Sequence, residues 1–210
     1  MRPLLQNGVT NLFLGHNGNN QAAVAYEAAF QEAATSNAVI LALVDTPGDG
    51  AVLRDRFALW LSAREHNPEL VKRLIAVKDW RRSLTGVALL ALVMDAIGAE
   101  HRNASVVVLL ELSGDMLSTQ PDDRVFQAAS DLIALLPHDA MVVLSIAIGP
   151  DGMPVPQSYA EGAQRVYRVQ SSGTAMRLTI TPMAPLHGNP IRLQGHVAHG
   201  GVVLVDDDDA

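Results

Sequence analysis

The segment Gly15-His16-Asn17-Gly18-Asn19-Asn20-Gln21 carries residue types that can hold an anion at the start of a helix. It stands between an apolar strand pattern that ends at Leu14 and a helix pattern that begins at Ala22. Backbone N–H groups at a helix N-terminus bind phosphate and other anions without any charged side chain. The same residues would also form a tight turn with an asparagine cap. The candidate anion- or nucleotide-binding residues are Gly15, Asn17, Gly18, Asn19 and Asn20.

Two acidic residues stand where strand patterns end, and carboxylates at such positions act on ligands in many α/β proteins. Asp45 could hold a ribose hydroxyl, although it lies 30 residues after Gly15, which is farther than the usual separation of about 20. Glu111 ends a buried strand pattern and could coordinate Mg²⁺ or activate water. The alternative for Asp45 is a solvated strand end. The alternative for Glu111 is a structural or vestigial acid, since neither a lysine nor a hydroxyl accompanies it.

A basic cluster between residues 72 and 82 consists of Lys72, Arg73, Lys78, Arg81 and Arg82. The last three follow a strand pattern, on the side of a parallel sheet where α/β proteins bind their ligands. They are therefore candidates for binding phosphate or an acidic partner. The alternative is a solvated first turn of the next helix. Cations at a helix N-terminus oppose the helix dipole, which favours a function for Arg81 and Arg82.

Several other kinds of site are disfavoured by the composition. The chain has no cysteine, so disulfides, thiolate nucleophiles and cysteine metal ligands are excluded. His196 and His199 are three residues apart on a strand pattern and would lie on opposite faces, which suits no metal site. No Gly-x-Ser-x-Gly sequence is present to anchor a hydrolase triad. We therefore predict no catalytic residue, no metal and no cofactor.

Charge and hydropathy predict a cytoplasmic protein without a membrane segment. The formal net charge of the 210 residues is −7, and no long basic run favours binding to nucleic acid. The longest apolar run, Val87–Met94, is far shorter than the roughly 20 residues of a spanning helix. The N-terminus lacks the apolar segment of a signal peptide. We expect protein partners and no membrane insertion.

Alternating strand and helix patterns predict a mainly parallel sheet over the first 150 residues. The apolar runs at 105–112 and 141–148 show no polar alternation, so both faces of these strands should be buried. Two hairpins follow, 165–170 with 177–181 and 191–197 with 202–205. We expect one α/β domain over 1–205 and a disordered acidic tail over 206–210. The other expected elements are strands 10–15, 37–44 and 70–77, a turn at 47–50, and helices 20–35, 51–65 (apolar face Val52, Phe57, Trp60 and Leu61), 83–97 (capped by Gly98) and 122–136.

This order of elements resembles the RecA-like branch of the P-loop ATPases, in which a parallel α/β core is followed by antiparallel strands on one edge. The segment 10–21 stands where the Walker A loop would lie. Leu74–Val77 with the helix at 83–97 resembles the third strand and helix of that family, and Val106–Glu111 resembles its Walker B strand. The resemblance covers about residues 8–182. It implies a three-layer RecA-like core with a mainly parallel sheet.

The phosphate loop departs from the pattern of that family. Walker A reads G-x-x-x-x-G-K-[ST], with a lysine for the β- and γ-phosphates and a hydroxyl for magnesium. Here Gly15 and Gly18 have another spacing, and Asn20 and Gln21 replace neither functional residue. ATP hydrolysis by the usual mechanism is therefore not expected. The chain resembles a degenerate group that keeps the fold without the loop, such as the cell-division inhibitor SulA and the RecA-like part of the cellulose-secretion regulator BcsE.

These observations favour a RecA-like pseudo-ATPase, a non-catalytic protein that regulates or scaffolds by binding other proteins. The resemblance implies a bacterial secretion, cell-envelope or cell-division system, and assembly into homo- or hetero-oligomers through sheet edges. One alternative is an enzyme that binds a nucleotide through a nonstandard loop, with Asp45 or Glu111 as its acid. A weaker alternative is a DNA-associated accessory factor that uses the basic cluster at 72–82.

Overall fold

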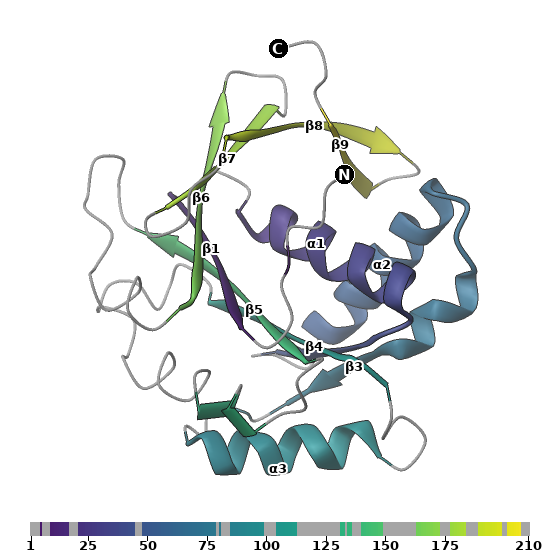
Figure 1. The fold of residues 1–210 in the computed structure, drawn as a ribbon. Helices are drawn as coiled ribbons and strands as arrows, with labels where there is room; N and C mark the ends of the chain where they lie inside the picture. The colour runs from purple at the N-terminus through teal and green to yellow at the C-terminus, as the bar shows by residue number, and fades with distance from the viewer. Residues whose placement is uncertain are drawn as a thin grey trace.

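A single mixed sheet organises the molecule. The computed structural model describes residues 5, 9–16, 21–44, 48–78, 80, 85–98, 104–112, 131–132, 134–135, 140–148, 163–172, 177–183, 189–198 and 201–206. Its strands are β1 (Thr10–His16), β2 (Val39–Leu43), β3 (Leu74–Val77), β4 (Val106–Leu112), β5 (Met141–Ile148), β6 (Arg165–Ser172), β7 (Arg177–Pro182), β8 (Ile191–Ala198) and β9 (Gly201–Asp206). They lie in the order β3-β2-β4-β5-β1-β6-β7-β8-β9 (Figure 1). Neighbouring strands are parallel from β3 to β6 and antiparallel from β6 to β9.

Helices cover both faces of the parallel strands. On one face, which carries Phe13, lie α1 (Gln21–Ser36) and α2 (Asp49–Ala63); on the other, which carries Leu12, lies α3 (Gly86–Ile97) (Figure 1). Successive residues of a strand point to opposite faces, so helices on both sides bury every position of an unbroken apolar run. The structure confirms the expected α/β class, with a mainly parallel sheet and antiparallel strands at its C-terminal end.

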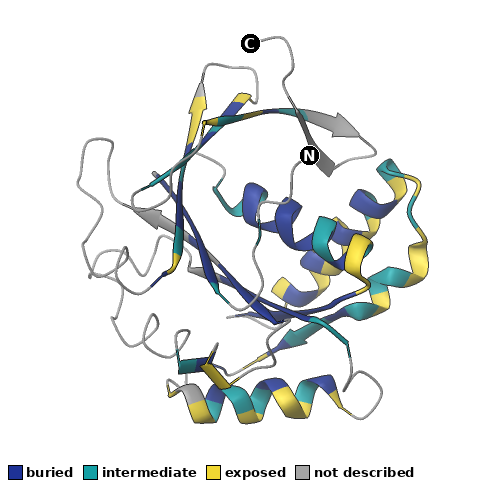
Figure 2. Cartoon of the chain, in the orientation of Figure 1, coloured by how far each residue is buried: buried dark blue, intermediate teal, exposed yellow. Residues whose placement is uncertain are grey.

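The antiparallel strands curl out of the plane of the parallel core and arch over α1 (Figure 1). β9 contacts both α1 and α2, and Leu178, Ile180 and Leu193 belong to the same buried cluster as the side chains of α1. Every residue of α1 from Val24 to Phe30 is buried as a result (Figure 2). A helix that is enclosed on all sides needs no polar face, which explains the alanine-rich sequence of α1.

A buried carboxylate joins α1 to the end of α2. The side chain of Glu27 is only 3% exposed, and its two oxygens accept hydrogen bonds from Trp60 Nε1 at 2.9 Å and from Arg64 Nη2 at 2.6 Å. The Arg64 guanidinium also lies 4.5 Å from the centre of the Trp60 ring, and His66 stacks on that ring. Burying a charge is costly unless it is paired and hydrogen-bonded. Glu27 meets both conditions, so it is a structural acid.

Two strands begin later than their apolar patterns suggest. The strand expected at 70–77 begins at Leu74, because Pro68 starts the 3₁₀ helix η1 (Pro68–Arg73). Its cap is Asn67, whose Oδ1 accepts the backbone N–H of Glu69 at 3.0 Å. The strand expected at 37–44 begins at Val39, because Asn37 has a φ of 60° and ends α1. Asparagine is one of the few residues that adopt this left-handed conformation readily.

The helix boundaries also differ in part from those expected. Asp49 and Gly50, expected in a turn, are the first residues of α2. Val52 is 66% exposed and does not belong to the buried face of α2. Gly98, with a φ of 62°, ends α3 as expected and donates its N–H to the Met94 carbonyl oxygen at 3.3 Å.

Two expected elements lie partly outside the described residues. The helix expected at 122–136 is described only at 131–132 and 134–135, which are helical. The acidic tail was expected to begin at residue 206, but Asp206 is the last residue of β9 and pairs with Leu193 of β8. Residues 207–210 lie outside the described part of the chain. The tail therefore begins at least one residue later than expected, since the antiparallel pairing extends to Asp206.

Candidate functional site

The end of β1 places Gly15 directly beneath the first residue of α1. Gly15 is buried, and a Cβ added to it would lie 2.7 Å from Gln21 Oε1 and 2.9 Å from Gln21 Cβ. Cβ atoms do not approach other heavy atoms this closely without a shift. Only glycine therefore fits at position 15 while the Gln21 side chain lies over it. The other candidates in the loop, Asn17, Gly18, Asn19 and Asn20, lie outside the described residues.

β5, which lies beside β1, and β4, the next strand, each carry a polar residue near the level of the end of β1. Glu111 of β4 pairs in register with Ser145 of β5, and Ser145 pairs in register with Phe13 of β1, two residues before Gly15. The Ser145 side chain is buried, and its Oγ has no hydrogen-bond partner among the described residues. Sequence reasoning missed Ser145. A lone hydroxyl in the apolar run Met141–Ile148 was the signal that could have identified it.

Lys78 lies exposed at the carboxyl end of β3, as the strand pattern predicted. β3 is the edge strand, and β2, β4 and β5 separate it from β1. At about 4.8 Å per strand, the ends of β3 and β1 are roughly 19 Å apart. A cation at this distance does not neutralise an anion held at Gly15, so the structure does not bring these two candidates together. Asp45, Arg81 and Arg82 lie outside the described residues.

Two members of the basic cluster have partners inside the chain. Lys72 forms an exposed ion pair with Glu69, one turn earlier in η1, and exposed pairs of this kind contribute about 0–1 kcal/mol. Arg73 donates from Nη1 to the carbonyl oxygen of Asn37, which ties η1 to the end of α1. Both contacts give these cations a structural role.

The described part of the chain offers little for a metal or a membrane. No group of three or more His, Asp or Glu side chains in it is arranged to hold a metal ion. None of its helices has both the length and the apolar character that crossing a bilayer requires. Comparison with models of known families finds no match, and no curated protein is significantly similar to this sequence.

The groups described next to Gly15 on the α1 side of the sheet are neutral, and the cation nearest to them in the pairing is Arg168 of β6, which is in register with Leu14. Gln21 presents a neutral amide over Gly15, and Ser145 provides a hydroxyl two residues deeper in the sheet. Phosphoryl transfer needs positive groups or metal ions to stabilise the charge that develops on the transferred phosphate. Lys78, which the sequence suggested as a phosphate-binding cation, lies after β3 at the far edge of the parallel core.

Proposed function

We propose that this chain is a non-catalytic RecA-like domain that acts by binding other proteins. It would regulate or scaffold a bacterial secretion, cell-envelope or cell-division system. The parallel core, the antiparallel strands at one edge and the helices on both faces support this proposal. The proposal includes the three-layer arrangement of RecA-like proteins.

The contact between Gln21 and Gly15 carries the proposal. In a working phosphate loop, glycines let the backbone approach the phosphates, and a lysine supplies the charge. Here the glycine at the end of β1 lies against the Gln21 side chain, whose Oε1 would be 2.7 Å from an added Cβ. The space next to the backbone of Gly15 is thus filled by a neutral group of the protein itself. An amide in this place supports loss of nucleotide chemistry and retention of the fold.

The sheet edges bear on how partners could bind. Arg54 of α2 donates from Nε to the carbonyl oxygen of Leu74 at 3.2 Å, which caps a backbone acceptor of the edge strand β3. At the opposite edge, β9 lies against α1 and α2. Capping and covering edge strands are ways in which proteins limit pairing with other chains. Assembly through β3 would therefore require Arg54 to release the Leu74 carbonyl.

Titration calorimetry with nucleotides tests the absence of nucleotide chemistry. ATP and GTP with Mg²⁺, NAD and a cyclic dinucleotide should give no binding heat up to about 1 mM, where the binding free energy falls to about −4 kcal/mol. Purification of the tagged chain from its native host, with chemical cross-linking, should in parallel yield a stoichiometric protein partner. Micromolar nucleotide binding that Gly15→Val abolishes would refute the proposal, and so would a chain that remains without any partner.

A second candidate function is a nucleotide-binding enzyme with a nonstandard loop, and Ser145 is the observation that favours it. Its buried Oγ lacks a partner among the described residues, and its neighbour in the pairing is Glu111. A buried hydroxyl without a partner costs free energy, and a bound ligand would relieve that cost. The same calorimetry, repeated with Ser145→Ala, tests this candidate, because a ligand that contacts the hydroxyl should bind more weakly to the variant.

A further inference from the structure

The C-terminal strands differ in charge from the rest of the chain. Residues 163–205 contain four arginines and no Asp or Glu, within a chain whose net charge is −7 and which holds 22 acidic residues. At the average frequency of the chain, a segment of this length would hold about four or five acids. The segment therefore has a formal net charge of +4, against −11 for the rest of the chain (−7 minus +4), because it lacks acids. Potentials of one sign on one surface steer partners of the opposite sign.

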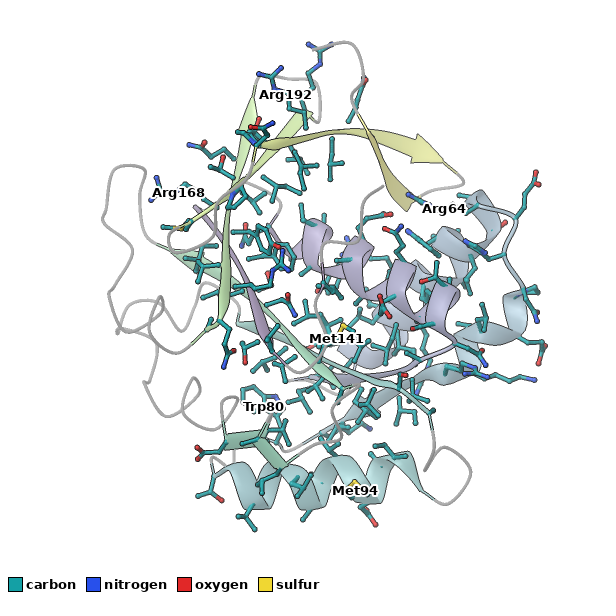
Figure 3. The ribbon with its side chains drawn as sticks, in the orientation of Figure 1. Arg64, Trp80, Met94, Met141, Arg168 and Arg192 are labelled. Atoms are coloured by element: carbon teal, nitrogen blue, oxygen red, sulfur yellow. The ribbon has the colours of Figure 1, made fainter. Side chains whose placement is uncertain are left out.

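The pairing of these strands sorts their residues onto two faces. The inner positions, Tyr167, Val169, Leu178, Ile180 and Leu193, are buried in the cluster around α1. Successive side chains alternate between faces, so the intervening positions form what we term the outer face. Figure 3 shows Arg168 and Arg192 directed away from α1. Apart from Val166, which is buried in the cluster on the α3 side, its described members are Arg168, Gln170, Arg177, Thr179, Thr181, Arg192 and Gln194.

The outer face is polar and accessible. Gln170, Arg177 and Arg192 are exposed, and the other members are half-buried. Thr179 pairs in register with Gln170 on one side and with Arg192 on the other, and Arg177 pairs with Gln194. Each arginine therefore has threonine or glutamine near it, whose hydroxyl and amide groups can bind the backbone of a ligand. None of these seven residues is acidic or aromatic.

The spacing of the arginines suits an extended acidic peptide. Arg177 and Arg192 are one strand and two residues apart in the register, which corresponds to about 8 Å between their Cα atoms. In an extended peptide, side chains on the same face recur every ~7 Å. Two carboxylates on one face of such a peptide can therefore reach the two guanidinium groups together. Arginine is well suited to this role because its planar fork binds a carboxylate through two hydrogen bonds.

We propose that the outer face of β6, β7 and β8 binds an extended acidic segment of a partner protein. Nucleic acid fits less well, because single strands bind largely by stacking their bases on aromatic rings, and the described outer face has none. A duplex would also extend across the acidic remainder of the molecule, whereas a short peptide stays within the positive region. Arg168 of this surface pairs in register with Leu14, next to Gly15, but Arg177 and Arg192 lie on β7 and β8, two and three strands away from β1. The proposal rests on these two arginines and does not depend on whether the loop after β1 binds a nucleotide.

Fluorescence anisotropy with a labelled peptide of eight aspartates tests the proposal. The chain should bind this peptide and not a peptide of eight asparagines, and the affinity should fall as salt is raised. Arg177→Gln/Arg192→Gln should weaken binding about tenfold, since two charge-assisted contacts are lost. The matched control is Lys72→Gln/Lys78→Gln, which removes the same charge from two other exposed sites and should change the affinity less than about twofold.

Three outcomes of this experiment would overturn the proposal. Equal weakening by the lysine control would show a general charge effect, and no weakening by the arginine variant would place the binding elsewhere. Tighter binding of a DNA duplex of equal charge would identify nucleic acid as the partner class. Circular dichroism of all variants checks that they are folded. If the double variant unfolds, the single change Arg192→Gln should still weaken peptide binding about threefold.

Discussion

The contact between Gly50 of α2 and Ala76 of β3 predicts a sharp limit on side-chain size. A Cβ added at Gly50 would lie 2.5 Å from Ala76 Cβ, while an added Cβ at Gly48, two residues earlier, would have nothing within 4 Å. Two carbon atoms prefer a separation of about 3.5–4.0 Å. Gly50→Ala therefore forces α2 and β3 apart by roughly 1 Å or more, because neither methyl group can rotate away.

The effect of Gly50→Ala on the free energy of unfolding can be estimated from two opposing contributions, overpacking and helix propensity. Overpacking in a well-packed interior costs about 1–3 kcal/mol, and alanine recovers up to about 1 kcal/mol relative to glycine in a helix. We expect Gly50→Ala to lower the free energy of unfolding by about 1–2 kcal/mol, which corresponds to roughly 2–8 °C in Tm for a chain of this size. Urea unfolding followed by tryptophan fluorescence measures it, since Trp60 and Trp80 are both buried.

Two further variants decide whether the steric reasoning is right. Gly48→Ala should change stability by less than about 1 kcal/mol, because its φ of −76° suits alanine and the space around it is open. Gly50→Ala/Ala76→Gly should be more stable than the sum of the two single changes predicts, by about 1 kcal/mol or more. A Gly50→Ala protein as stable as the parent, or strictly additive effects in this cycle, would refute the close contact.

Three further substitutions test the buried polar contacts. Glu27→Ala should lower the free energy of unfolding by about 3–5 kcal/mol, because Arg64 loses a buried partner; in urea titrations Glu27→Gln should cost less, and equal losses would argue against the ion pair. Gly15→Ala should cost about 1–3 kcal/mol, and adding Gln21→Ala should recover part of it; thermal unfolding that shows additive losses would contradict the contact. Ser145→Ala should leave the Tm unchanged or raise it, because the orphan hydroxyl is removed; a loss above about 1 kcal/mol would mean that the hydroxyl is bonded.

The parallel core was predictable from the sequence because burial on both faces leaves an unmistakable pattern. Val106–Leu110 and Met141–Ile148 contain almost no polar residue, as strands with helices on both sides do; their shorter length and many β-branched residues distinguish them from the apolar run of α3. The hairpins of the C-terminal strands were also predictable from the sequence, since apolar and polar residues alternate in β6 and β7. In both cases the information lies in residues that are close together in the sequence.

The contacts around the candidate site were not predictable, because they join residues far apart in the chain. Glu27 looks like an ordinary exposed residue of a helix, and only its contacts with Trp60 and Arg64 explain its burial. The strand expected from residue 70 failed for a local reason, since Asn67 and Pro68 favour a capped 3₁₀ turn over the apolar pattern. The placement of Gln21 over Gly15 depends on where α1 meets β1, which no periodicity in the sequence records.

The arginines of the outer face agree with the proposed binding of an acidic segment, because the packing of the inner positions around α1 does not dictate the charge of the outer ones. Enclosure of α1 fixes the inner positions of β6, β7 and β8 as apolar, but it leaves the outer positions free to carry any polar residue. If solubility alone chose those residues, acids would occur among them, since acidic residues outnumber Lys and Arg by 22 to 15 in the chain and acids favour solubility more than cations do. Their complete exclusion from 163–205 is what recognition of a negatively charged partner requires, since one carboxylate on this face would repel the ligand that the arginines attract.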